Sequence, residues 1–65
     1  MDVNITVKEK MKFIEGILED LDSAKYNDIY HAFYYFEDPK VKEELRKKYS
    51  EAEVRTFGAR MSSKL

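Results

Sequence analysis

The sequence predicts an all-α fold, a small bundle of three to four short helices in a single domain over residues 1–65. Apolar side chains recur at helical spacing throughout the chain, and no stretch alternates as a strand would. The segments TVKE and SEAE resemble capping boxes, and the pair Asp38–Pro39 is typical of a helix start. With two Gly and one Pro, the chain offers no linker, and residues 1–5 are expected to be a frayed or extended lead-in.

The first helix is predicted to begin at Thr6, which would cap the amide of Glu9 while the Glu9 carboxylate reaches back. Gly16 lies away from the apolar side of this helix and is interpreted as a tolerated glycine. Three acids share another face that is expected to be solvated: Glu15, Glu19 and Asp22. The apolar stripe at 3.6-residue spacing consists of Val7, Met11, Ile14, Ile17, Leu18 and Leu21.

The second helix contains the stretch YNDIYHAFYYF, which places six aromatic rings and the only histidine within eleven residues. If Ser23 is the cap, this helix covers residues 24–37, and if Asn27 is the cap it is one turn shorter. On a helical wheel, one face of about 120° is wide enough to be the centre of the core. That predicted core face consists of Tyr26, Ile29, Tyr30, Phe33 and Phe36.

The third helix is predicted from Pro39 to about Tyr49, with Asp38 as its cap. The ion pairs expected along it join positions 43 with 47 and 44 with 48, each four residues apart. A fourth helix should begin after a Ser50 cap. The sequence leaves open whether these two helices are separate or form one bent rod. Their expected apolar positions are Val41, Leu45, Tyr49, Val54, Phe57, Met61 and Leu65.

A candidate partner-binding surface lies outside the predicted core face of the second helix. Its residues are Asn27, His31, Tyr34 and Tyr35. Tyrosine suits an interface because it provides a large contact area and a polar tip at a low cost in side-chain entropy. The leading hypothesis is therefore a small cytoplasmic protein-binding or regulatory module that binds a protein partner or a second copy of itself.

The alternative hypothesis is a helix-turn-helix-like protein that binds nucleic acid through its basic C-terminal part. Residues 39–65 carry eight Lys or Arg against four Glu, and such an excess can meet phosphates. Two features oppose this reading: the turn at Tyr49–Ser50 is too short, and the last helix begins with Glu51 and Glu53. The same charge pattern would also let the basic part attract the acidic N-terminal part within the fold. The candidate phosphate-binding residues are Lys47, Lys48, Arg55, Arg60 and Lys64.

Several kinds of chemistry have no support in the sequence. The chain has no Cys and one His, so it offers no disulfide, no thiolate metal site and no recognisable catalytic triad. It also lacks a Gly-rich phosphate loop. No apolar run approaches the roughly 20 residues that span a bilayer. We therefore expect no enzymatic activity, cofactor, metal, small-molecule substrate or membrane association, and we expect a cytoplasmic location.

Overall fold

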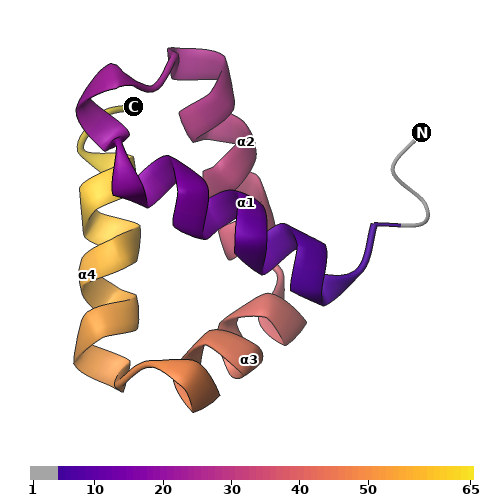
Figure 1. Cartoon of the computed structure of the whole chain (residues 1–65). Helices are drawn as coiled ribbons and strands as arrows, with labels where there is room; N and C mark the ends of the chain where they lie inside the picture. Colours follow the sequence, from indigo (N-terminus) through magenta and orange to yellow (C-terminus); the bar gives the residue numbers. More distant parts are fainter. Residues whose placement is uncertain (1–4) are drawn as a thin grey trace.

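The computed structural model describes residues 5–65, which form four α-helices and one short 3-10 helix (Figure 1). No strand occurs in this part of the chain, and the all-α prediction is confirmed. In Figure 1, α1 crosses α2, α3 closes one end of the molecule, and α4 runs along its side. The elements are α1 (Val7–Glu19), η1 (Leu21–Ser23), α2 (Tyr26–Phe36), α3 (Pro39–Lys48) and α4 (Glu51–Ser62).

Three of the four α-helices begin where their caps predict. Thr6 and Ser50 both form complete capping boxes with the glutamates three residues later. The Asp38 carboxylate accepts a hydrogen bond from the amide of Lys40, with Pro39 at the first helical position. Tyr49 and Ser50 are extended, so α3 and α4 are separate helices.

The start of α2 differs from both predicted possibilities. Leu21 is buried inside the tight turn of η1, where the amides of Ser23 and Ala24 donate hydrogen bonds to the carbonyls of Asp20 and Leu21, each three residues earlier. Because the chain is held in this turn through Ser23, α2 begins only at Tyr26. Its N-cap is Lys25, whose side chain makes no capping hydrogen bond. A long-range apolar contact thus overrides the local capping preference of Ser23 and Asn27.

The hydrophobic core draws on all four α-helices and on η1. Phe36 packs against α4 at Gly58, where an added Cβ would lie 2.8 Å from the ring carbon Cε2. A Cβ at Gly16 would meet nothing within 4 Å, which agrees with the interpretation of a tolerated glycine. The buried residues are Ile14, Leu18, Leu21, Ile29, Ala32, Tyr35, Phe36, Val41, Leu45, Val54 and Met61.

The predicted orientation of α2 is wrong in one respect. Tyr26 and Tyr30 were expected in the core, but they are 57% and 58% exposed. The core instead takes Ala32 and Tyr35 from the other side of the helix. Phe13 of α1, which the predicted stripe omits, explains the rotation: its ring centroid lies 5.7 Å from that of Tyr35 in an edge-on contact.

Candidate protein-binding surface

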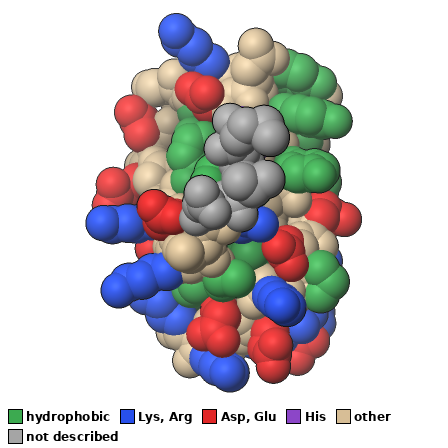
Figure 2. Space-filling model, turned by 90° about the vertical axis from the view of Figure 1, so that its right-hand side faces the viewer, with side chains coloured by type: hydrophobic (Ala, Val, Ile, Leu, Met, Phe, Trp, Pro, Cys, Tyr) green, Lys and Arg blue, Asp and Glu red, His purple; other side chains and the backbone are tan. Residues whose placement is uncertain are grey.

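The most prominent exposed apolar feature is a row of three tyrosines along α2, which we call the tyrosine ridge: Tyr26, Tyr30 and Tyr34. They are 57%, 58% and 69% exposed. Their spacing of four residues places them one above another on the same side of the helix. None of their hydroxyls is hydrogen bonded to another residue in the described part of the chain. Figure 2 shows hydrophobic side chains exposed one above another along one edge of the molecule.

Three of the four residues predicted for the partner-binding surface lie together beside this ridge. Asn27, His31 and Tyr34 join Tyr30 in lining a shallow surface hollow of about 380 Å³. The prediction for Tyr35 is wrong, because this side chain is only 7% exposed and packs on Phe13. The exposed aromatic side chains of α2 therefore exclude Tyr35 and include Tyr26 and Tyr30, which were assigned to the core.

His31 forms the border between the ridge and the core. Its ring centroid lies 4.7 Å from that of Tyr35 and 5.7 Å from that of Phe13, while the residue itself is exposed. Tyr34 also touches Tyr35, at 6.5 Å between ring centroids. His31 and Tyr34 thus connect the exposed surface of α2 to the buried ring of Tyr35.

The ends of α2 carry charges whose signs oppose its helix dipole. Lys25 stands at the positive, N-terminal end, and Glu37 caps the negative, C-terminal end; both are exposed. The Lys25 side chain forms no ion pair within residues 5–65. Glu37 lies 3.9 Å from the Nζ of Lys42, the longest ion pair in this part of the chain. Within residues 5–65, Lys25 thus has no ion pair, and the Glu37 carboxylate has one long ion pair, with Lys42.

At the end of α3, one of the candidate phosphate-binding lysines is engaged with α1. Lys48 Nζ lies 2.8 Å from Glu15 Oε2, and the Tyr49 hydroxyl donates a hydrogen bond to the same oxygen. The hydrogen bonds from Lys48 and then Tyr49 hold the pKa of Glu15 below its ordinary value. The reverse effect of the carboxylate raises the pKa of Lys48 and of Tyr49. These three groups join α1 to α3.

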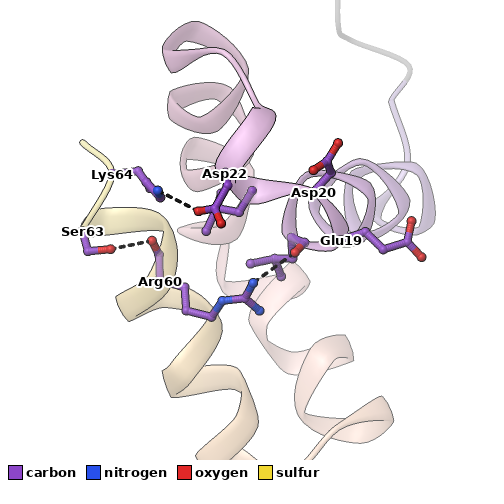
Figure 3. Close-up of a pocket in the computed structure, with 8 residues that line it drawn as sticks. Glu19, Asp20, Asp22, Arg60, Ser63 and Lys64 are labelled. Carbon is purple, nitrogen blue, oxygen red and sulfur yellow. Dashed lines mark hydrogen bonds and ion pairs between the residues drawn. The ribbon is translucent and has the colours of Figure 1, made fainter.

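At the far end of α4, two further candidates are engaged with α1 and η1 around a hollow of about 390 Å³ (Figure 3). The Arg60 guanidinium donates to the carbonyl of Leu18 at 3.1 Å, and Lys64 Nζ lies 2.9 Å from Asp22 Oδ1. The hydrogen bond from Lys64 lowers the pKa of Asp22. Since α1 has no basic residue in its own last turn, Arg60 supplies the cation that its C-terminal end favours.

The remaining two candidates pair along their own helices. Lys47 lies 3.2 Å from Glu44, and Arg55 lies 3.7 Å from Glu51. The pairs predicted at spacing four in α3 are not those observed: Glu44 pairs with Lys47, and Lys48 pairs with Glu15. All five candidate cations thus contact groups of this chain. The end of α3 and the C-terminal end of α4 also lie at opposite ends of the molecule (Figure 1), so the cations of these two segments are far apart.

Two further features were sought in residues 5–65: a cluster of metal ligands and a membrane-spanning helix. These residues contain no group of three or more His, Asp or Glu side chains placed to hold a metal ion. No helix among them is long and apolar enough to cross a membrane. Comparison of the chain with protein-family models, curated proteins and solved structures finds no match. The exposed side chains of α2 are therefore the candidate site.

Proposed function

We propose that this chain is a small non-enzymatic protein-binding module with a regulatory role, and that the tyrosine ridge of α2 is its binding surface. The observation that carries the proposal is the exposure of three adjacent tyrosines, each more than half exposed, on one side of one helix. Scattered exposed apolar residues are ordinary on protein surfaces. A contiguous apolar patch is the feature that indicates an interface.

The size and chemistry of the patch favour a protein as the ligand. At about 200 Å² for a tyrosine side chain, the three exposed portions add up to roughly 350 Å². That area lies within the range of the largest patches on monomeric proteins, which are often functional. Asn27 and His31 place polar groups beside the rings, as at the rim of a protein interface.

Nucleic-acid binding receives no comparable support. Each of the candidate cations Lys47, Lys48, Arg55, Arg60 and Lys64 contacts a carboxylate or carbonyl of this chain. A phosphate would have to compete with those contacts. It would also meet candidate cations divided between the end of α3 and the C-terminal end of α4, which lie at opposite ends of the molecule (Figure 1).

The proposal can be tested by photo-crosslinking in cells that express the chain. Benzoylphenylalanine is placed at position 30 on the ridge or at position 56, because Thr56 is also exposed, on α4, but lies off the ridge. We expect a discrete protein adduct from position 30 and none from position 56. Equal adducts from both positions, or none from either, would contradict the proposal.

The binding that produces the adduct must then be measured with purified proteins. The captured protein is identified by mass spectrometry, and its affinity for the unmodified chain is measured by titration calorimetry. Tyr34→Arg should weaken that affinity at least about tenfold, as expected for the loss of an interface tyrosine. Thr56→Arg is the matched control and should leave it unchanged.

A further inference from the structure

We infer that the occupant of the tyrosine ridge is a second copy of this chain, bound antiparallel along α2 across a two-fold axis beside Tyr30. This inference rests on the proposed function and names the partner of that same surface. It follows from the symmetry of the ridge, from the charges at the two ends of α2, and from the small size of the chain.

The ridge has the symmetry that such a dimer needs. Tyr26 and Tyr34 lie four residues on either side of Tyr30, about 6 Å along the helix axis in each direction. A two-fold axis perpendicular to α2 at Tyr30 therefore pairs Tyr26 of one copy with Tyr34 of the other. It also brings the two Tyr30 rings together. A surface that binds its own copy must be self-complementary in this way.

The end charges of α2 provide electrostatic complementarity in the same arrangement. Lys25 lies five residues before Tyr30 and Glu37 lies seven residues after it. In the antiparallel pair these positions differ by only about 3 Å along the axis. Lys25 of each copy is then placed near Glu37 of the other, and the two helix dipoles oppose each other. Two symmetric ion pairs of opposite charges can form in this way.

The area available suits a modest association. The three tyrosines expose roughly 350 Å² per chain, and Asn27 and His31 widen the contact beyond that value. The ridges of two copies would bury about 700 Å² in total, less than the roughly 1,200 Å² of the smaller specific interfaces, so we expect a weak association with a dissociation constant in the high micromolar range. Chains of this length commonly gain stability by association, because a single small hydrophobic core contributes little to the free energy of folding.

Sedimentation equilibrium from about 1 to 500 µM tests the inference directly. The wild-type chain should fit a monomer–dimer equilibrium. Tyr30→Arg should raise the dissociation constant at least about tenfold, while the matched control Thr56→Arg should leave it unchanged. Circular dichroism of each variant shows whether the fold is retained. A wild-type chain that remains monomeric, or a dimer that survives Tyr30→Arg, would overturn the inference.

Charge reversal tests the antiparallel orientation. Lys25→Glu and Glu37→Lys should each weaken the dimer at least about threefold, and the double variant should return the dissociation constant to within about twofold of wild type. Within a single chain, Lys25→Glu improves the match to the helix dipole and should raise the melting temperature of the dilute protein, whereas Glu37→Lys also removes the pair with Lys42 and carries no such expectation. For Lys25→Glu, weaker association of a more stable monomer is thus the diagnostic result. Single reversals that leave the dissociation constant unchanged would contradict this geometry.

The two proposals fail in distinguishable ways. A monomeric chain whose position 30 crosslinks to a different protein would overturn the dimer and leave the ridge as a binding surface. A monomeric chain with no adduct at position 30 would remove both. A dimer whose crosslink joins position 30 of two copies would support both.

Discussion

Two sets of side chains lie at the surface: the tyrosine ridge of α2 and the charged groups that join α1 to α3 and α4. They differ in whether their polar groups have a bonding partner within the described chain. Lys48, Arg60 and Lys64 each reach a carboxylate or carbonyl more than 30 residues away in sequence. The ridge tyrosines contact no such partner within residues 5–65. An excess of one residue type therefore does not locate a binding surface. We propose that the binding surface lies where the fold leaves exposed side chains without a partner within residues 5–65.

Both regions should contribute little to the free energy of folding. Exposed ion pairs typically contribute 0 to about 1 kcal/mol each, so the charged contacts orient the helices more than they hold the fold together. The ridge contributes less still in the isolated chain, because its rings remain largely in water. The fold should therefore depend mainly on the buried core.

The largest expected effect separates the core from the ridge. Leu45 is fully buried, so Leu45→Ala should lower the free energy of unfolding by about 2–5 kcal/mol. Tyr30→Ala, at a concentration where the chain is monomeric, should change it by less than about 0.5 kcal/mol. Urea denaturation of both variants measures the difference. Similar losses from the two substitutions would show that the ridge belongs to the core.

A second comparison uses the two glycines. In Gly58→Ala the new Cβ would press on the buried ring of Phe36, which should cost about 1–3 kcal/mol. In Gly16→Ala the Cβ meets open space, so the better helix propensity of Ala should add up to about 1 kcal/mol of stability. Thermal denaturation should give shifts of opposite sign. Shifts of the same sign would mean that α2 and α4 do not approach as closely as described.

The contact between α1 and α3 predicts a pH dependence. The pKa of Glu15 is lowered in the folded state, so its contribution to stability is present above the ordinary glutamate value and is lost as the pH falls below about 4.3. Glu15→Gln should cost about 1 kcal/mol at pH 7 and reduce the acid-induced loss. The pKa of Tyr49 is raised in the folded state. The stability that its hydroxyl contributes is therefore present below about pH 10 and is lost as the pH rises above that value.

Denaturant titrations from pH 3 to pH 7 measure the acid effect. Glu19→Gln is the control, because the Glu19 carboxylate forms no ion pair within residues 5–65. If Glu15→Gln and Glu19→Gln had the same pH profile, the contact of Glu15 with Lys48 and Tyr49 would be absent in solution.

The smallest effects distinguish two arginines of α4. Arg60 bonds to the end of α1, so Arg60→Ala should lower the free energy of unfolding by about 0.5–1 kcal/mol. Arg55 forms only an exposed pair with Glu51 at 3.7 Å, so Arg55→Ala should cost less than about 0.5 kcal/mol. Chemical denaturation of the two variants in parallel measures both. A larger loss from Arg55→Ala would reverse their assigned roles.

The sequence predicts the features that depend on neighbouring residues. The caps at Thr6, Asp38 and Ser50 are satisfied within three residues of their own position, so local chemistry is enough to place those helix starts. The core positions of α3 and α4, such as Leu45 and Met61, follow from helical spacing, because those helices have narrow apolar stripes.

The features that depend on distant residues were not predictable in this way. α2 is apolar on most of its circumference, so its pattern alone does not decide which rings turn inward. The contact of Phe13 with Tyr35 decides it, and the small Ala32 facing the core is the sequence feature that could have indicated the rotation. Similarly, Lys48 contacts Glu15 from another helix although Glu44 lies four residues away on its own.

The orientation of α2 is the central claim, and tyrosine nitration by tetranitromethane tests it most directly. The dilute protein is treated briefly, digested, and the nitrated residues are quantified by mass spectrometry. We expect rapid nitration of Tyr26, Tyr30 and Tyr34 and slow nitration of Tyr35, whose neighbour Tyr34 is the matched reference. At high concentration the ridge tyrosines should become protected while Tyr35 stays slow. Nitration of Tyr35 as fast as that of Tyr34 would contradict the described face of α2 and the binding surface built on it.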